Sequence, residues 1–319
     1  MKTRKLGRSD LHFSVVGLGT WAMGGGEWAF GWGPQEEAES IGAILAAAAA
    51  GVNWVDTAAV YGFGIAEETV GKALRQIREP MLVATKCGLA WDDQGRIEGR
   101  LRRESVLAEC DASLRRLGVD VIDLYQIHWP RDEAALEEGW DAISTLIEQG
   151  KVRYAGVSNF SVDQMKRVQA LAPIASLQPP YHLLQRDIET EILPFCREHD
   201  IGVIAYSPMA RGLLTGKVTP AWVAALDDSD HRKHDPAFQS PQLEENLKKV
   251  ESVVAIADRL GCRPAHVAVA WVLHRPEITA AIVGGRSAGQ ARENALAAEV
   301  TLSDADLAEL DGVFAPSAE

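Results

Sequence analysis

Short apolar runs alternate along this chain with longer segments in which apolar residues recur every three or four positions. The short runs are apolar at consecutive positions, which predicts strands buried on both faces, and the longer segments have the spacing of amphipathic helices. We expect eight such strands, at residues 15–18, 53–57, 81–86, 121–128, 154–159, 176–179, 201–207 and 279–285. Two shorter runs, 3–6 and 11–14, should form a hairpin that turns at Gly7 and Arg8.

Residues typical of helix caps locate several helix ends. One helix should begin at Ser105 as its N-cap and end at Gly118, and the next should end at Gly150. Ser161 and Gln164 have the spacing of a capping box. Parallel strands with helices outside them predict one domain over residues 1–319, an α/β fold of the (β/α)8 TIM barrel type. The long segment 212–242 that follows the seventh strand should overhang the barrel mouth as a lid.

Three of the predicted strands end in an ionisable residue: Asp56, Lys86 and His128. In a barrel these ends share one face, which carries the active site, and Tyr61 can reach it from the loop after Asp56. A phenol donates its proton poorly at neutral pH unless a neighbouring cation stabilises the anion. Lys86 could be that cation, Asp56 could hold it, and His128 could share the proton on a substrate oxygen. Each residue alone has an ordinary structural explanation, but their convergence favours carbonyl reduction.

The remaining strand ends are polar or rich in glycine. Amide and hydroxyl side chains suit a carboxamide, an aromatic ring suits a flat heterocycle, and a glycine loop before a helix suits a phosphate. These are the parts that bind a nicotinamide dinucleotide. For the serine and asparagine residues taken singly, ordinary turn chemistry is as good an explanation. The residues concerned are Ser158, Asn159, Gln178, Tyr206, Ser207, Gly284, Gly285 and Arg286.

Four tryptophans, Trp21, Trp28, Trp32 and Trp129, follow the first and fourth predicted strands. Large amphipathic rings line sites for sugars and small carbonyl compounds, but they also pack loops, and the two interpretations are evenly balanced. With Tyr61 and His128, they form the expected substrate pocket.

Composition excludes several classes of protein. A net charge of -13 argues against a surface for DNA or RNA, which would need clustered Lys and Arg. The four cysteines are far apart without a CxxC pair, so we expect neither a metal site nor disulfides. The apolar segment 41–52 is too short to span a membrane, and the basic start makes a poor signal peptide, so we expect a cytoplasmic protein. Cys87 is either a redox-sensitive thiol or a small buried apolar residue.

One motif points to a different fold. Residues 15–22 match the GxGxxA fingerprint of a Rossmann dinucleotide site. However, Gly24, Gly25 and Gly26 interrupt the helix that this fingerprint requires, and no Tyr is followed by Lys four residues later. The barrel is therefore the preferred fold.

Seven motifs in this sequence resemble those of the aldo-keto reductase superfamily, and the early Trp-rich segment is most similar to bacterial sugar- and stress-associated reductases. They are GLGTWAMGG, DTAAVYGFGIAEETVGKAL, VATKCG, DLYQIHWP, VRYAGVSNF, AYSPMARGLLTGK and GGRSAGQAREN. The resemblance implies a (β/α)8 barrel that interconverts aldehydes or ketones with alcohols, without a metal, using NADPH or NADH. It makes Tyr61 the general acid, Asp56 and Lys86 the residues that tune it, and His128 the residue that orients the carbonyl.

The resemblance also assigns cofactor contacts. Ser158, Asn159 and Gln178 would hold the carboxamide, with Tyr206 stacked on the nicotinamide. Many relatives have a Lys-Ser pair for the adenosine 2'-phosphate where this chain has Gly284 and Gly285. This leaves Arg286, Ser287 and Gln290 for that role, with NADPH preferred. The other expected cofactor contacts are Gly19, Thr20, Trp21, Asp56, Ser207, Pro208, Met209, Arg211, Gly212, Lys217, Glu293 and Asn294.

A second hypothesis belongs to another functional class. The chain could be a cofactor-sensing regulatory subunit, because the potassium-channel β-subunit branch of the superfamily keeps a similar catalytic set. The short ends of the chain, with no appended segment, favour an enzyme. Oxidation of NADPH with small aldehydes or aldoses would indicate an enzyme, and cofactor binding without turnover would indicate a regulatory subunit. The oligomeric state has no signal in the sequence.

Overall fold

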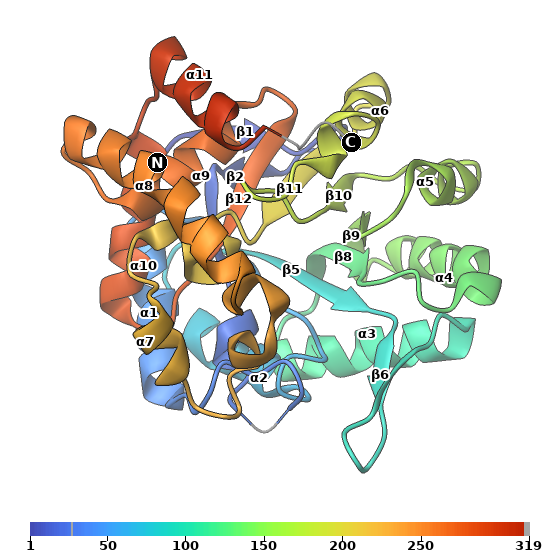
Figure 1. Ribbon diagram of the computed structural model, residues 1–319. Helices are drawn as coiled ribbons and strands as arrows, with labels where there is room; N and C mark the ends of the chain where they lie inside the picture. The colour runs from blue at the N-terminus through green and yellow to red at the C-terminus, as the bar shows by residue number, and fades with distance from the viewer. Residues whose placement is uncertain (27, 316–319) are drawn as a thin grey trace.

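Eight parallel strands close into a barrel in the computed structural model, which describes residues 1–26 and 28–315 (Figure 1). The last strand pairs with the first, so the sheet has no free edge. In spatial order the strands are β3 (Val16–Gly19), β4 (Trp54–Asp56), β5 (Leu82–Cys87), β8 (Ile122–Ile127), β9 (Val152–Ser158), β10 (Ser176–Gln178), β11 (Gly202–Tyr206) and β12 (Ile278–Gly284). Each overlaps one of the eight predicted strands, and the expected (β/α)8 barrel is confirmed.

Helices surround the barrel and connect its strands (Figure 1). Those between or after the strands are α1 (Glu37–Ala49), α2 (Ile65–Leu74), α3 (Arg103–Leu117), α4 (Leu136–Glu148), α5 (Val162–Gln169), α6 (Ile192–Glu198), α9 (Pro264–His274) and α10 (Ala288–Ala295). Three more are α7 (Pro220–Ala224), α8 (Gln242–Leu260) and α11 (Asp304–Val313). Because β3 leads into a short 3-10 turn and α1 begins only at Glu37, the Rossmann alternative is wrong.

The first strands of the chain close the N-terminal end of the barrel. β1 (Thr3–Lys5) and β2 (His12–Ser14) form the expected antiparallel hairpin, although its turn spans Leu6 to Leu11 rather than Gly7 and Arg8 alone. Phe13 stacks on Trp54 inside the barrel, with ring centroids 4.4 Å apart. A Cβ on Gly17 would lie 2.1 Å from the Trp54 ring, so only glycine fits beside this tryptophan.

The predicted helix ends are mostly correct, with one error. Gly118 directly follows α3, Gly150 lies two residues after the end of α4, and both have left-handed backbones. Ser161 forms the capping box with Gln164. The N-cap at Ser105 is wrong, because α3 begins at Arg103 and Ser105 lies inside it. The Glu138 carboxylate of α4 accepts the Arg103 N–H at 2.8 Å, so a neighbouring helix satisfies the first turn in place of a serine.

The segment after β11 lines the barrel mouth as expected but is not irregular. It contains α7 and 3-10 turns at Ala210–Thr215, His231–His234 and Pro236–Phe238. A second hairpin, β6 (Leu89–Trp91) and β7 (Ile97–Gly99), was not predicted and extends from the barrel after β5 (Figure 1). Within the described residues, no helix is long and apolar enough to cross a membrane.

Candidate active site

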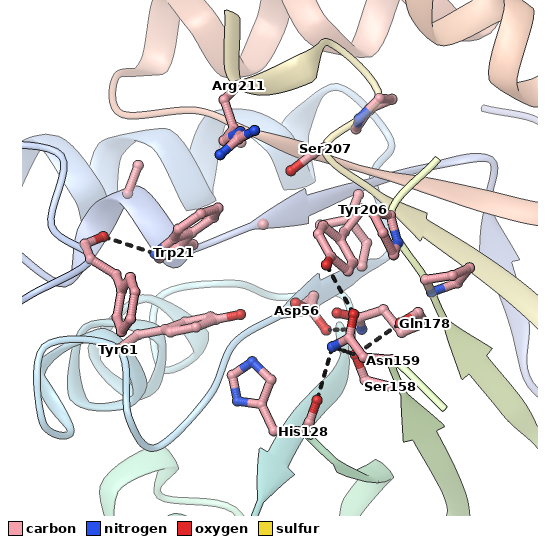
Figure 2. Close-up of a pocket in the computed structure, with 18 of the residues that line it drawn as sticks. Trp21, Asp56, Tyr61, His128, Ser158, Asn159, Gln178, Tyr206, Ser207 and Arg211 are labelled. Atoms are coloured by element: carbon pink, nitrogen blue, oxygen red, sulfur yellow. Dashed lines mark hydrogen bonds between the residues drawn. The ribbon is translucent and has the colours of Figure 1, made fainter. Parts of the chain in front are cut away.

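A cavity of about 1050 Å³ opens at the C-terminal ends of the barrel strands. Figure 2 shows Tyr61 and His128 on one side of it and Asn159, Gln178 and Tyr206 on the other. Most of the residues predicted for the site line this cavity, namely Gly19, Trp21, Trp28, Trp32, Asp56, Tyr61, His128, Trp129, Ser158, Asn159, Gln178, Tyr206, Ser207, Pro208, Met209, Arg211, Gly212, Gly284, Gly285, Arg286 and Gln290.

A buried ion pair forms the floor below Tyr61. Strand alternation places Asp56 and Lys86 on the inner face of the barrel, two residues beyond Trp54 and Ala84. The Lys86 Nζ lies 2.6 Å from Asp56 Oδ1 and donates at 2.9 Å to the Thr57 carbonyl. It is also 3.2 Å from Tyr61 Oη. The three donor hydrogens of the ammonium therefore have three acceptors, which fixes its position relative to the phenol.

Burial determines the protonation states of Tyr61 and Lys86. Loss of solvent, followed by the charge of Asp56, raises the pKa of the Tyr61 phenol well above its usual value. Burial lowers the pKa of the Lys86 ammonium, and the Asp56 carboxylate opposes that shift. The phenol therefore keeps its proton at neutral pH and can donate it.

His128 faces the same cavity from the end of β8. Its ring meets that of Tyr61 edge to face, with centroids 5.6 Å apart. Burial, and then the charges of Lys86 and Arg131, hold the pKa of this imidazole well below its usual value. A neutral ring has one N–H donor and one acceptor nitrogen, so His128 can hydrogen-bond a carbonyl oxygen without carrying charge.

Amide side chains form a second polar group, on the opposite side of the cavity (Figure 2). Asn159 has a left-handed backbone, with φ of 61°, which asparagine tolerates better than most residues. Its Nδ2 donates to the His128 carbonyl and to Ser158 Oγ, while its Oδ1 accepts from Tyr206 Oη at 2.9 Å. Gln178 donates to Asp56 Oδ2 at 2.8 Å, which couples this group to the ion pair.

Six predicted site residues do not line the cavity. Lys86 is one of them, because it contacts Tyr61 and Asp56 from below, and Lys217 is exposed at the surface. The side chains of the other four contact neighbouring residues of the protein. Thr20 donates to the Asp56 carbonyl, Ser287 caps α10, Glu293 pairs with Arg263 and His266, and Asn294 donates to the Gly284 carbonyl.

Arg286 connects the loop before α10 to the Trp-rich segment after β3. Its guanidinium donates to the Trp32 and Pro34 carbonyls and to Gln35 Oε1. All three acceptors are uncharged, and no acidic side chain of the described residues lies within ion-pair distance of it. Arg286 thus holds a loop in place through uncharged acceptors and has no ion-pair partner among the described residues.

The loops after β3 and β11 also bind each other across the mouth. Trp32 and Asp230 form an antiparallel bridge, and the His231 backbone and ring Nδ1 both contact the Gly31 carbonyl, at 3.0 and 3.1 Å. The Arg232 guanidinium lies 4.1 Å from the Trp32 ring centroid and pairs with Asp230. These contacts join the predicted lid to the loop after β3 at the cavity mouth, and its role as a lid remains a prediction.

The strand-end argument missed several cavity residues. His182, Arg131, His231 and Arg232 line the mouth but follow the strand ends by several residues or lie within the long segment. Extending the strand-end argument a few residues past Gln178 would have found His182. Nothing periodic marks the other three.

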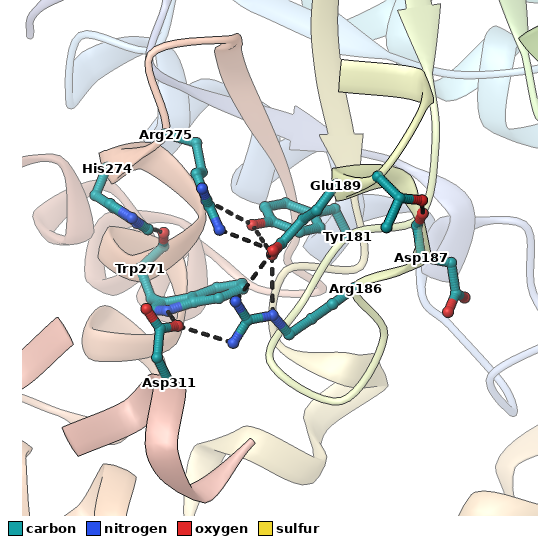
Figure 3. A network of polar contacts seen from close by, with 9 residues as sticks. Tyr181, Arg186, Asp187, Glu189, Trp271, His274, Arg275 and Asp311 are labelled. Atoms are coloured by element: carbon teal, nitrogen blue, oxygen red, sulfur yellow. Dashed lines mark hydrogen bonds and ion pairs between the residues drawn. The ribbon is translucent and has the colours of Figure 1, made fainter. Parts of the chain in front are cut away.

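A polar network outside the cavity holds the segment after β10 (Figure 3). The Glu189 carboxylate accepts from Tyr181 at 2.7 Å, Arg186 at 2.9 Å and Arg275 at 2.8 Å, and Arg186 also reaches Asp311 of α11. The intervening residues His182, Gln185 and Asp187 line the cavity. The network therefore joins the segment after β10, which forms one wall of the cavity mouth, to α11.

Cys87 follows Lys86 on β5 and is 1% exposed. Its Sγ donates to the Gln126 carbonyl at 3.6 Å, and burial raises the pKa of the thiol well above its usual value. A protonated, buried thiol packs as a small apolar side chain.

Comparison with known proteins identifies the family. The model of the aldo/keto reductase family matches residues 15–315. The chain is 39% identical to aldo-keto reductase YhdN of Bacillus subtilis over 91% of this chain and 86% of that protein. It is 35% identical to the NADH-specific methylglyoxal reductase of Escherichia coli, over 96% of each. The structure of glycerol dehydrogenase AKR11B4 from Gluconobacter oxydans superposes with a TM-score of 0.89, at 38% identity, over 98% of this chain and 95% of that one.

The chain therefore belongs to the aldo/keto reductase family. It is an oxidoreductase that uses a nicotinamide cofactor and acts on a carbonyl substrate or the corresponding alcohol. The fold and family expected from the sequence motifs are both confirmed.

Proposed function

We propose that this protein reduces small aldehydes, ketones and aldoses, and oxidises the corresponding alcohols, with Tyr61 as general acid and NADPH as the preferred cofactor. The observation that carries the proposal is the position of the Lys86 Nζ, 2.6 Å from Asp56 and 3.2 Å from Tyr61 Oη on the cavity floor. A phenol that is buried, protonated and in contact with a held ammonium is suited to donate a proton to a carbonyl oxygen.

The proton transfer follows from these contacts. Tyr61 Oη donates its proton to the substrate oxygen, and the Lys86 ammonium stabilises the phenolate that remains. Asp56 holds the ammonium in place through the reaction. Neutral His128 donates a second hydrogen bond to the same oxygen and so orients the carbonyl. The reduced nicotinamide supplies the hydride when it is bound.

The polar group opposite Tyr61 fits the nicotinamide. Both hydrogens of Gln178 Nε2 are donated, to Asp56 and Gln126, which leaves Oε1 as an acceptor for a carboxamide N–H. Asn159 fixes the hydroxyl of Tyr206, so this ring presents a stationary flat face to the cavity. Apart from Gly284 and its chain neighbours, no atom of the described residues lies within 4 Å of the position that a Cβ of Gly284 would take, which leaves space for a phosphate before α10.

The preference for NADPH rests on Arg286. A guanidinium that has no ion-pair partner among the described residues attracts a dianionic phosphate, and two of its five N–H donors remain after the three loop contacts. The methylglyoxal reductase is NADH-specific at 35% identity. At least one relative therefore uses NADH, and the cofactor choice of this protein requires a measurement.

Two relatives favour a class of substrate. Methylglyoxal and glycerol, which appear in their names, are short molecules with oxygens on adjacent carbons. A cavity walled by Trp21, Trp28 and Trp129 suits such compact polyoxygenated molecules.

A substrate panel tests the proposal. The oxidation of NADPH and NADH should be followed with methylglyoxal, glyceraldehyde, dihydroxyacetone and an aldose, and the reverse reaction with glycerol. We expect turnover of at least one short carbonyl compound, with a lower KM for NADPH than for NADH. Binding of either cofactor without turnover of any compound would contradict the proposal and favour a regulatory subunit.

A further inference from the structure

Four arginines line the cavity among the residues that the structure describes, and three of them are held by other protein groups. Arg211 and Arg232 each pair with an aspartate of the segment after β11, and Arg286 donates to three uncharged acceptors. Arg131 is exposed, and its guanidinium makes no hydrogen bond or ion pair with any described residue. All five of its N–H donors are therefore available to a ligand.

The backbone of Arg131 is fixed even though its side chain has no polar partner. A Cβ on Gly99 of the β6–β7 hairpin would lie 2.5 Å from the Arg131 Cβ, so the hairpin and the loop after β8 approach each other closely. Asp132 Oδ2 accepts the Leu101 N–H at 3.1 Å and joins the same two segments. The Arg131 guanidinium carbon lies 5.5 Å from the centroid of the Trp129 ring, which leaves the donors at its edge free. The side chain thus starts from a fixed point on the cavity wall.

Arg131 lies on the substrate side of the cavity. It follows His128 by three residues, whereas the other three arginines of the cavity follow β11 or β12, near the proposed cofactor contacts. Leu89 and Ile97 of the hairpin line the same wall and are apolar. The charge of Arg131 acts at the reacting end, since it lowers the pKa of His128 together with burial and Lys86. A substrate with its carbonyl at His128 would therefore extend past Arg131 on its way to solvent.

We propose that Arg131 binds an anionic group, a carboxylate or a phosphate, at the end of the substrate remote from the reacting carbonyl. This rests on the proposed reductase function and adds a charged class of substrates to it. Guanidinium matches both groups through two parallel hydrogen bonds. The protein as a whole repels anions, because its formal net charge is -13, so the attraction must be local. Uncharged aldehydes leave the exposed guanidinium in water, and they remain substrates with a higher KM.

The test compares two anionic aldehydes, each with an uncharged partner of similar shape, at saturating cofactor. The pairs are glyceraldehyde 3-phosphate with glyceraldehyde, and 4-oxobutanoate with its methyl ester. The value of kcat/KM should be higher for the anion in at least one pair, and that pair identifies phosphate or carboxylate as the group bound. Arg131→Gln should lower this anion-to-neutral ratio about tenfold, through KM, since an exposed guanidinium is screened by water. The uncharged aldehydes should change little.

Arg100→Gln is the matched control. It removes the same charge near the same hairpin, but Arg100 pairs with Glu98 and does not line the cavity, so the ratio should stay as in the parent. No preference for either anion would overturn the proposal. So would an equal loss with charged and uncharged aldehydes in Arg131→Gln, an unchanged ratio, or an equal fall of the ratio in Arg100→Gln.

A second measurement needs no variant. For the parent protein, kcat/KM with the preferred anion should fall as the salt concentration rises, because salt screens a local attraction, while the uncharged partner should be unaffected. Screening of the overall negative charge alone would raise the rate with the anion, so a rise or a constant rate would contradict the role of Arg131. If no aldehyde is turned over at all, the proposed function itself fails. Turnover of uncharged aldehydes without preference for the anions removes only the role of Arg131.

Discussion

The two sides of the cavity are held together in different ways. On the barrel side, Asp56 and Lys86 are at most 3% exposed, lie on adjacent strands and contact each other directly. On the loop side, contacts join side chains to backbone carbonyls of distant loops, as in Arg286 with Trp32 and His231 with Gly31. Sheet register cannot change without unfolding the barrel, whereas a few loop contacts can break and re-form.

This difference assigns separate tasks to the two sides. The strand ends fix the positions of the atoms between which a proton moves, so substitutions there should lower kcat. The loops enclose the ligand, and changes there should appear in dissociation constants. Substitutions on each side of the cavity test this division.

The largest effect should come from Tyr61→Phe. The change removes the proton donor and little volume, so kcat should fall about 10²- to 10⁴-fold while both cofactors still bind. Steady-state rates with the best substrate of the panel, and cofactor titration by tryptophan fluorescence, give the two quantities. Near-parental turnover, with the chemical step shown to be rate-limiting, would mean that another group supplies the proton.

Lys86→Met should reduce turnover to a comparable extent and move the basic limb of the pH–rate profile upward. The Lys86 ammonium lies 3.2 Å from Tyr61 Oη and stabilises the phenolate. Without this cation the pKa of Tyr61 rises further above its usual value, so the phenol loses its proton at higher pH. The measurement is kcat against pH for parent and variant, with circular dichroism as a check of folding, since Asp56 is left without its cation. An unchanged basic limb of the pH–rate profile in Lys86→Met would contradict this role of Lys86.

Arg286→Ala should weaken NADPH about 10- to 150-fold and NADH far less. A charge-assisted hydrogen bond to the 2'-phosphate contributes about 1.5 to 3 kcal/mol, and NADH has no such phosphate. Dissociation constants of both cofactors measure the effect. Equal weakening of the two would mean that Arg286 acts only by holding the loop, and tighter binding of NADH by the parent protein would overturn the NADPH preference.

The smallest effect should come from Gln35→Ala, which removes one tether of the same loop and leaves the charge of Arg286 in place. We expect both cofactors to weaken alike, by about 2- to 10-fold, as for loss of a neutral hydrogen bond. This variant is the control for Arg286→Ala, because the two share the loop contact and differ in charge. A selective loss of NADPH in Gln35→Ala would show that loop position, rather than charge, sets the preference.

The sequence predicts the barrel side better than the loop side, and the reason is physical. Strand alternation and strand ends are local properties, so Asp56, Lys86 and His128 could be placed at one mouth from the chain alone. The helix start at Arg103 depends on Glu138, which lies 35 positions further along the chain. The contacts of Arg286 with Trp32 span 254 positions. No local pattern encodes such partners, so the arrangement of the loops required the structure.

The N-terminal hairpin has a consequence for how the chain is made. Arg4 donates to the carbonyls of Leu273 and Ile278, 269 and 274 positions further along the chain, so the hairpin completes these contacts only after most of the barrel has been synthesised. Until β12 is synthesised, Phe13 and its neighbours have no closed barrel to enter, and apolar surface stays exposed. The hairpin is therefore among the last parts of the barrel to be protected from proteases.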